Sequence, residues 1–376
     1  MDQTIVFASL GTVLIDNVVN VDAKVRQRRL GGGGLYAAAG ARIWLSPEDV
    51  FLSVRGTKTE LSRDMVEDLH RLSLDEYLWS QSGEGSILQS EIQYKAGQRS
   101  FRYLNPRPST HLQSFPSTSL VHIAKHLHFC CSPKDLAVSL EQVSTYPRRP
   151  IIVYEPIPVA CTPSHLEPLK AILPIVDIFS PNHRELRMFL DKETLEDPAV
   201  WIEGLTRMYH EYGAKTIIVR AGAHGSYVSN KDTALGKIGS SWIPPYSSEE
   251  AGFQVNDTTG AGNSFLGGLC AGLDRESSDV FRAAVYGSVS ASFIIQQAGL
   301  PVLGHSEGGS ELWNGERPGD RLQREPIDPP VADADSQRHA VLSMPPTHNI
   351  GRQTALETGY ACSPRHGEPY LHWSNA

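Results

Sequence analysis

Between residues 120 and 230, short apolar runs alternate with longer amphipathic stretches, and turn residues separate them. The apolar runs have the length of β-strands: HLHFCC from His126, IIVYE from Ile151, VDIFS from Val176 and TIIVR from Thr216. Continuous apolar strands that alternate with helices are typical of a parallel sheet covered on both faces. The pattern predicts an α/β fold with a mainly parallel central sheet, which binds ligands at the carboxyl ends of its strands.

The composition predicts one large domain followed by a tail. The chain has 376 residues, of which 40% are apolar and 20% charged, and α/β domains of about 300 residues are common. We therefore expect one domain over residues 1–322. Residues 323–376 are rich in Pro, Asp, Ser and His without periodicity, which predicts a disordered tail. Within the domain, residues 86–104 alternate polar and apolar around KAGQR, which predicts a β-hairpin that serves as a small lid.

The charge of the chain restricts its partners. A net charge of −8 argues against a nucleic-acid or anionic-membrane surface, because such binding depends on clustered Lys and Arg. The one dense basic run, Arg26–Arg29, precedes four glycines. Such a run is usually a solvated face, and a contact with substrate or phosphate is the alternative. We expect a small-molecule partner, no nucleic acid and no membrane.

The cysteines and the N-terminus favour a cytoplasmic protein. The cysteines are odd in number and show neither a CxxC nor a Cys/His metal spacing, which predicts reduced thiols. The first 19 residues are apolar but contain Asp2 and no basic region, so we interpret them as a buried strand. His126 and His128 share a strand face with Cys130, and packing is the favoured role because no carboxylate completes a metal site. The cysteines are Cys130, Cys131, Cys161, Cys270 and Cys362.

The stretch DTTGAGNSF, residues 257–265, predicts a phosphate-binding turn. Gly260, Ala261 and Gly262 lie directly before an apolar helix. Backbone N–H groups at a helix start bind anionic oxygens and complement the helix dipole. A helix entry that needs glycine for its shape is the alternative, but Asp257, Thr258 and the small residues of the following helix favour phosphate.

Five motifs in order resemble the PfkB, or ribokinase-like, carbohydrate kinases. DTTGAGNSF is similar to the family's DTxGAGD signature, GGGGLYAAAGA to its GGxxxNxA segment, SPNHREL to NxxE and VRAGAHGSYV to TxGxxG; SLGTVLID is similar to a first strand that ends in a substrate-facing Asp. The resemblance covers residues 4–300 and implies a three-layer sandwich with a β lid, to which residues 16–35 and 86–104 contribute. EPIPVACTP and GAGNSFLGG resemble the fungal Mak32-like branch more closely.

The resemblance also implies roles for individual residues. Gly260, Ala261 and Gly262 would form the anion hole and Asn263 stands at the position of the catalytic base. ATP would contact Asp257, Thr258, Asn182, Glu185, Arg220, Gly222 and Gly225, and Glu185 would hold Mg²⁺ through water. Asp16, Gly32, Gly33 and Tyr36 would face the acceptor. From the residues alone, a helix start with a favourable acidic residue is the favoured role for Asn182 and Glu185, and the order of the motifs reverses that preference. A turn cap is the alternative for Asp16.

Two positions differ from the family pattern. Tyr36 stands where the family has an Asn that contacts sugar, and Asn263 stands where it has the catalytic Asp. Three functions remain open: a slow kinase that uses ATP and Mg²⁺ on a hydroxyl-bearing metabolite, a catalytically silent nucleotide-binding protein that acts through a partner, and another nucleotide-dependent enzyme on the same fold. The resemblance also implies a homodimer through the lid at residues 86–104.

Overall fold

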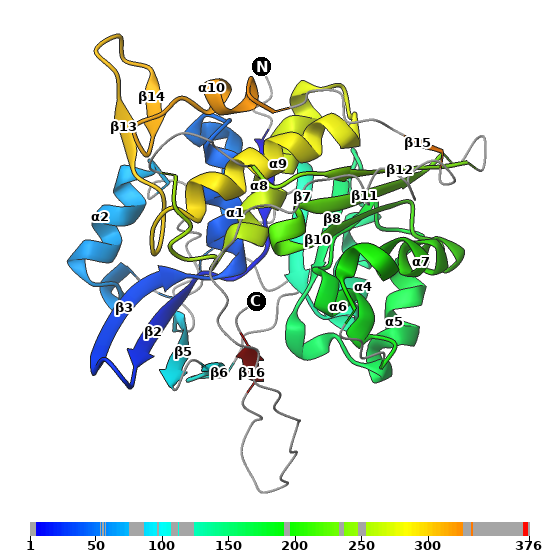
Figure 1. Cartoon of the computed structure of the whole chain (residues 1–376), viewed down its shortest axis with the longest axis horizontal. Coiled ribbons are helices and arrows are strands. Elements are labelled where there is room, and N and C mark those ends of the chain that lie inside the picture. The colour runs from blue at the N-terminus through cyan, green and yellow to red at the C-terminus, as the bar shows by residue number, and fades with distance from the viewer. Residues whose placement is uncertain are drawn as a thin grey trace, which may run out of the picture.

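The computed structural model has three layers, with helices on both faces of a central sheet and a smaller sheet beside them (Figure 1). It describes residues 5–325, except for 53, 55, 57, 75–85, 96–97, 107–111, 113–123, 192–195, 233–236 and 247–252, together with residues 332–333 and 371–374. The expected α/β sandwich with a β lid is therefore confirmed.

The central sheet has nine strands in the order β15-β12-β11-β10-β9-β8-β7-β1-β4. All pairs from β4 to β10 are parallel, and those from β10 to β15 are antiparallel. The strands are β1 (Ile5–Ser9), β4 (Val50–Leu52), β7 (Ala124–Cys131), β8 (Ile151–Pro156), β9 (Ile178–Phe179), β10 (Thr216–Arg220), β11 (Ser226–Lys231), β12 (Ile238–Ile243) and β15 (Ala332–Asp333).

Alternating strand residues build a separate core on each face of this sheet. In β8, Val153 belongs to one core, whereas Ile152 and Tyr154 belong to the other, as the two-residue period of a strand requires. On the first face lie α1 (Gly33–Arg42), α2 (Arg63–Arg71), α8 (Ala261–Arg275) and α9 (Val280–Ile294); on the second lie α4 (Pro133–Val143), α5 (Leu166–Ile172), α6 (His183–Met188) and α7 (Pro198–Glu211).

The lid is a five-stranded sheet in the order β16-β6-β5-β2-β3. The predicted hairpin is present as β5 and β6, while its turn at residues 96–97 lies outside the described residues. The lid strands are β2 (Leu14–Asn20), β3 (Val25–Gly31), β5 (Leu88–Lys95), β6 (Gln98–Tyr103) and β16 (Leu371–Ser374).

The sequence motif predicted that the first strand ends at Asp16, and this prediction is wrong. Strand β1 ends at Ser9, and Asp16 is the third residue of β2 in the lid. The chain turns between these strands because residues 10–13 pack against the start of α1, where the N–H of Gly34 donates to the carbonyl of Thr12 at 3.0 Å. The apolar run is thus two strands in two sheets.

Two short pieces of the predicted tail are described, and both add strands. β15 pairs with β12, and β16 pairs with β6 at the edge of the lid. The disordered character predicted for the rest of residues 323–376 stays a prediction, because those residues lie outside the described part. Before the tail, β13 (Leu303–His305), β14 (Glu311–Trp313) and α10 (Pro318–Leu322) follow α9; short 3-10 turns occur at Pro47–Asp49, Lys58–Glu60, Pro158–Ala160, Pro163–His165 and Gly222–His224.

Helices α1 and α8 approach closely because glycines face the neighbouring backbone. A Cβ added at Gly267 would lie 1.9 Å from the carbonyl oxygen of Ala37, and one added at Gly40 would lie 2.0 Å from that of Ser264. Atoms cannot approach to these distances, so either side chain would force the helices apart. The helix that begins at the predicted phosphate-binding turn is thereby held against α1, which follows strand β3 of the lid.

We predict that Gly267→Ala destabilises the protein by about 1–3 kcal/mol, the usual cost of overpacking. Gly204→Ala is the matched control, since Gly204 lies inside α7 with no atom within 4 Å of an added Cβ; it should stabilise by roughly 0.5–1 kcal/mol through the lower entropy of the unfolded chain. Urea denaturation of both variants measures the difference. Equal midpoints for the two variants would contradict the close helix contact.

Candidate functional site

The predicted phosphate-binding turn forms the first turn of α8. Gly260 is the N-cap residue in the left-handed conformation, with φ +83°, which favours glycine. Behind it, the N–H of Ala261 donates to the carbonyl of Thr258, and Asp257 accepts from the N–H of Thr259 at 2.9 Å. The N–H groups of Gly262 and Asn263 make no hydrogen bond with any described residue. Two unpaired donors at a helix N-terminus are what an anionic oxygen binds.

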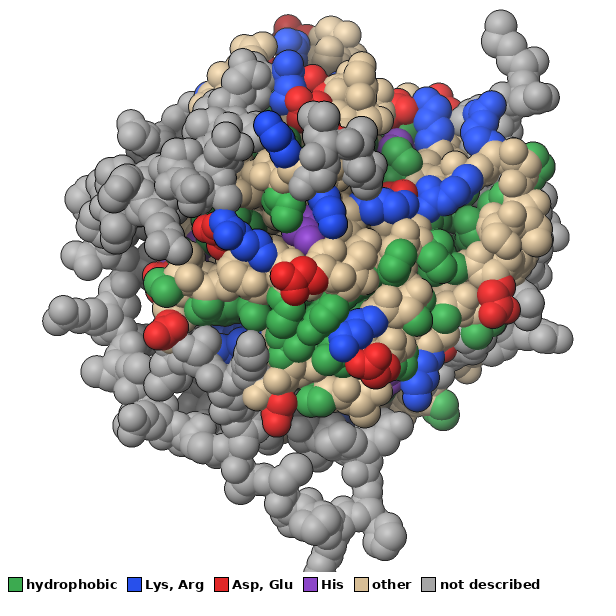
Figure 2. Space-filling model, turned by 90° about the vertical axis from the view of Figure 1, so that its right-hand side faces the viewer, with side chains coloured by type: hydrophobic (Ala, Val, Ile, Leu, Met, Phe, Trp, Pro, Cys, Tyr) green, Lys and Arg blue, Asp and Glu red, His purple; other side chains and the backbone are tan. Residues whose placement is uncertain are grey.

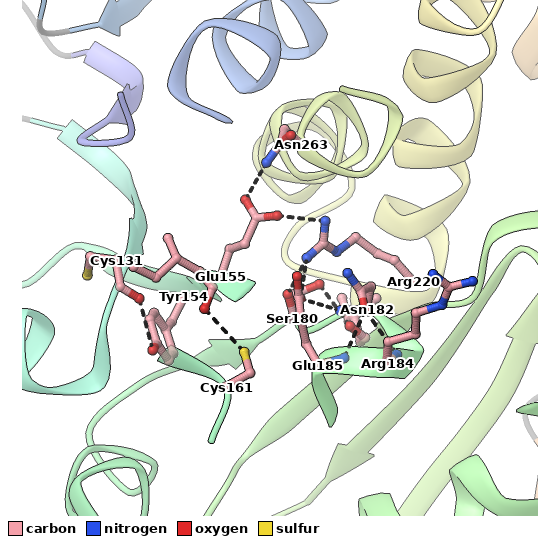
Figure 3. A network of polar contacts seen from close by, with 12 residues as sticks. Cys131, Tyr154, Glu155, Cys161, Ser180, Asn182, Arg184, Glu185, Arg220 and Asn263 are labelled. Atoms are coloured by element: carbon pink, nitrogen blue, oxygen red, sulfur yellow. Dashed lines mark hydrogen bonds and ion pairs between the residues drawn. The ribbon is translucent and has the colours of Figure 1, made fainter. Parts of the chain in front are cut away.

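Arg220, the last residue of β10, lies beside this turn. A Cβ added at Gly262 would be 2.4 Å from its Nη1 atom, so Gly262 leaves the space that the guanidinium occupies. The guanidinium forms ion pairs with Glu155 at 2.7 Å and with Glu185 at 3.5 Å, and donates to the carbonyl of Ser180 at 3.0 Å. Its positive charge thus lies next to the free N–H groups, between two carboxylates (Figure 3).

Asn263, which is partly buried, is linked by hydrogen bonds to a chain of buried polar side chains. Its Nδ2 donates to Oε2 of Glu155 at 2.7 Å, and the same oxygen lies 3.2 Å from Nε2 of His128. The other ring nitrogen of His128 lies 2.9 Å from the hydroxyl of Ser9. The residues come from α8, β8, β7 and β1, so the network connects the start of α8 to three neighbouring parallel strands. Figure 3 shows its first contact, between Asn263 and Glu155.

The two carboxyl groups beside Arg220 have opposite pKa shifts. Burial raises the pKa of Glu155, but Arg220, His128 and the Asn263 amide outweigh burial and lower it to about 2. Burial also raises the pKa of Glu185; Arg220 opposes this only in part, and the pKa is about 7. Glu155 therefore carries the permanent negative charge of the pair, while Glu185 changes its charge near neutral pH.

Asn182 and Glu185 form a reciprocal capping box at the start of α6. The side chain of Asn182 accepts from the N–H of Glu185 at 2.9 Å, and the carboxylate of Glu185 accepts from the N–H of Asn182 at 2.8 Å. Asn182 and Glu185 therefore cap the start of α6, which was the alternative role for them. The nucleotide and Mg²⁺ roles stay predictions. The ion pair with Arg220 links Glu185 of α6, on the second face of the sheet, to the residue that lies beside the start of α8 on the first face.

The predicted acceptor residues meet the start of α8 from the lid side. The ring of Tyr36 lies against Gly260, where an added Cβ would be 2.2 Å from the ring. The Tyr36 hydroxyl is buried and has no hydrogen-bond partner in the described part of the chain. Burial raises its pKa above the ordinary value, and Arg29, Asp16 and Asp257 are the charged groups that act on it. An unpaired buried hydroxyl is a group that a ligand can satisfy.

Glycines close the space between the lid and α8. A Cβ at Gly33 would lie 3.0 Å from Nδ2 of Asn263, so the glycine run and the base position adjoin. Gly32 has φ +105° and lies against the carbonyl of Thr12. Asp16 is buried in β2 and accepts from the hydroxyl of Ser90. The structure thus brings the first and last sequence motifs together.

The two glycines after β10 have different surroundings. Gly225 has φ +82°, and an added Cβ would lie 2.1 Å from the carbonyl of Ile243, so the close approach of β12 requires glycine there. Gly222 has φ +61° and no atom within 4 Å of an added Cβ. Gly222 therefore has open space beside it, two residues after Arg220.

Three residues of the site were not predicted as such. Glu155 and His128 complete the network around Asn263, and Arg29 forms an ion pair with Asp257 at 2.8 Å. Arg29 belongs to the basic run for which a solvated face was favoured; Arg26 and Arg28 are exposed, but Arg29 joins the lid to the phosphate-binding turn. Glu155 ends the apolar run IIVYE, and a carboxylate at the end of a parallel strand was the available signal.

Other features of the surface and the thiols bear on the same predictions. None of the four described cysteines forms a disulfide, while Cys362 lies outside the described residues. Within the described part, no three His, Cys, Asp or Glu side chains gather into a metal site. None of its helices has the length and apolar character needed to span a bilayer. Both basic and acidic side chains occur on the face shown in Figure 2.

We predict that Glu185→Gln removes a pH-dependent cost of folding. Because burial holds the folded pKa near 7, above the unfolded value of 4.5, wild-type stability falls as the pH rises from 4.5 to 7, by roughly 3 kcal/mol at about 1.4 kcal/mol per pKa unit. Gln keeps the capping box, so the variant should gain stability relative to wild type over this range. Chemical denaturation at pH 5 and pH 8 measures it; a constant difference would contradict the raised pKa.

Two fungal proteins are similar over most of the chain. An uncharacterized protein of Schizosaccharomyces pombe is 29% identical over 336 residues, which cover 84% of this chain and 91% of that protein. Protein MAK32 of Saccharomyces cerevisiae is 24% identical over 339 residues, covering 83% and 90%. The predicted similarity to the fungal Mak32-like branch is confirmed.

A solved structure and a family model agree with the fold. The ribokinase of Arabidopsis thaliana, solved with ribose and ATP, superposes with a TM-score of 0.56 at 20% identity, covering 78% of this chain and 93% of that one. The model that describes the pfkB family carbohydrate kinases matches residues 7–302. The chain therefore belongs to the pfkB family of carbohydrate kinases.

Proposed function

We propose that this protein binds ATP with Mg²⁺ at the start of α8 and transfers a phosphoryl group slowly to a hydroxyl group of a small metabolite, a sugar, a nucleoside or a related compound. The observation that carries the proposal is the pair of free N–H groups of Gly262 and Asn263, with the guanidinium of Arg220 beside them. Donors and positive charge arranged in advance stabilise the charge of a transferring phosphoryl group.

The residues present fit ATP and Mg²⁺. The left-handed Gly260 and the open space beside Gly222 suit a close approach of phosphate and nucleotide to backbone. Mg²⁺ is usually held by one or two carboxylates together with substrate phosphates, and Glu185 would be its carboxylate here. Bound Mg²⁺ would neutralise phosphate charge. The ATP in the ribokinase neighbour supports this choice of nucleotide.

The acceptor would lie between the lid and α8. Asp16 and the unpaired hydroxyl of Tyr36 can hydrogen-bond its hydroxyl groups, and Gly33 allows it to reach Asn263. Asn263 can orient an acceptor hydroxyl through its carbonyl oxygen, but it cannot take up the proton. Loss of a general base typically costs about 10²–10⁴ in rate, or roughly 3–5 kcal/mol.

Asn263 favours a second candidate function, in which the protein binds nucleotide without transferring phosphate and acts through a partner. Positioning and charge supply most of phosphoryl-transfer catalysis, so the intact donors favour slow transfer over none. We further propose a cytoplasmic protein that pairs through residues 86–104. The paired strand β16 already covers the edge of β6 within one chain, so such a dimer would use the face or the ends of the hairpin.

We predict that ATP binds with a Kd in or below the millimolar range and more tightly with Mg²⁺, as measured by calorimetry. Gly222→Asp should weaken binding at least tenfold, because it places a negative charge in the open space after Arg220. The isosteric Gly222→Asn is the control, since both residues tolerate the left-handed conformation and only one is charged. Absence of binding at millimolar ATP would refute the nucleotide site.

We also predict that transfer to common sugars is weak, about 10²–10⁴ below what a site with a general base achieves. A panel of sugars, polyols and nucleosides, assayed for ADP release and for phosphorylated product, measures it. Detectable product with any acceptor supports the slow kinase. ATP binding with no product from any member of the panel favours the second candidate.

A further inference from the structure

The orientation of the Asn263 amide is fixed by Glu155. A carboxylate only accepts hydrogen bonds, so the Nδ2 end of Asn263, 2.7 Å from Oε2 of Glu155, must face it. The Oδ1 end therefore points away from Glu155 and is left to accept from another group. On the lid side, a Cβ added at Gly33 would lie 3.0 Å from Nδ2. The amide is therefore at the boundary with the proposed acceptor region.

Glu155 cannot easily turn away from Asn263. One of its oxygens is held by Arg220 at 2.7 Å, and the other lies 3.2 Å from His128. Its side chain is only 6% exposed, so no water layer screens its charge. Glu155 is a fixed, ionised acceptor directed at the side chain of residue 263.

We propose that Glu155 is the positioning residue of this site: it orients Asn263 so that Oδ1 faces the acceptor hydroxyl, and it excludes an acidic side chain at position 263. An Asp there would bring two carboxylate oxygens within about 2.7 Å, where like charges cannot both stay ionised. The site thus keeps one carboxylate at this contact, on β8 rather than on α8. The catalytic part of the proposal rests on the proposed function; the orientation and the exclusion do not.

The helix dipole alone would predict the opposite effect of Asn263→Asp on stability, so the experiment distinguishes the two causes. Residue 263 lies in the first turn of α8, where an Asp complements the helix dipole and is usually favoured over a neutral side chain. Without Glu155, Asn263→Asp would therefore be neutral or stabilising. A loss of stability would have to come from Glu155.

The experiment compares wild type, Asn263→Asp, Glu155→Gln and the double variant. In the double variant the Gln amide can donate to the new carboxylate, so the same hydrogen bond forms with its donor and acceptor exchanged. We expect Asn263→Asp to lower the urea midpoint and the double variant to be more stable than the sum of the single changes. If Asn263→Asp does not fold, recovery of a folded protein by adding Glu155→Gln gives the same answer.

A pH profile separates charge repulsion from simple loss of a contact. In Asn263→Asp one carboxyl must take up a proton, so its stability relative to wild type should rise as the pH falls from 8 to 5. Asn263→Leu removes the hydrogen bond without adding charge, and its stability difference should stay flat. The titratable or charged groups that also face this contact are Arg220 and His128, with Glu185 and Cys130 next to Arg220.

Phosphoryl transfer gives the second readout. Asn263→Asp alone should gain no more than about threefold in transfer, whereas the double variant should gain at least about 10²-fold, the lower range for a general base. ATP affinity should change little in all four proteins, because the N–H groups of the turn remain. A third outcome separates the two proposals. If the stability effects of the two substitutions are coupled and that of Asn263→Asp depends on pH, but no variant transfers phosphate, the interaction between Glu155 and residue 263 is upheld and the proposed kinase activity is refuted.

The proposal is overturned if Asn263→Asp is as stable as wild type at pH 8, or if its loss of stability is independent of pH like that of Asn263→Leu. It is also overturned if Asn263→Asp alone gains transfer as strongly as the double variant. Either result would show that Glu155 neither orients residue 263 nor excludes an acid there.

Discussion

The guanidinium of Arg220 holds the site together. Buried between Glu155 and Glu185, and against Gly262, it joins the ends of β8 and β10 to the starts of α6 and α8. A buried ion pair is weak evidence for stability, because the loss of hydration offsets much of the attraction. Its value here is position: Arg220 places one positive charge beside two free N–H groups and fixes Glu155, which in turn fixes Asn263.

The lid depends on a second ion pair. Arg29 of β3 contacts Asp257 of the turn before α8 at 2.8 Å, and both side chains are partly exposed. Part of the attraction in such a pair is offset by the loss of hydration of its two charges, so its main effect is to hold β3 against the turn before α8. Both charges act on Tyr36, whose hydroxyl has no hydrogen-bond partner in the described part of the chain. The proposed acceptor region therefore lies between the Arg220 network and this second ion pair.

The sequence predicted the parts of this structure that depend on local pattern. Apolar runs such as IIVYE and TIIVR formed the expected parallel strands, and the glycine turn before Ala261 opened a helix as expected. The break after Ser9 was missed because residues 5–16 are apolar on both sides of Gly11; only contacts with Gly34 show that the chain turns there. The contact between Glu155 and Asn263 spans 108 residues, and no local pattern reports such a pairing.

Asn263 stands where the family has its catalytic Asp, and its side chain is matched to the neighbouring carboxylate of Glu155. An Asn in place of the catalytic acid could be a simple loss, in which case its surroundings would carry no trace of it. Here the amide donates to a carboxylate that Arg220 and His128 hold in place, and an acid would be repelled at the same spot. The substitution and its surroundings therefore form one arrangement, and the charge of the site is set by residue 155. Under the proposed function, the side chain at position 263 therefore orients an acceptor hydroxyl, while the carboxylate of Glu155 beside it stays ionised.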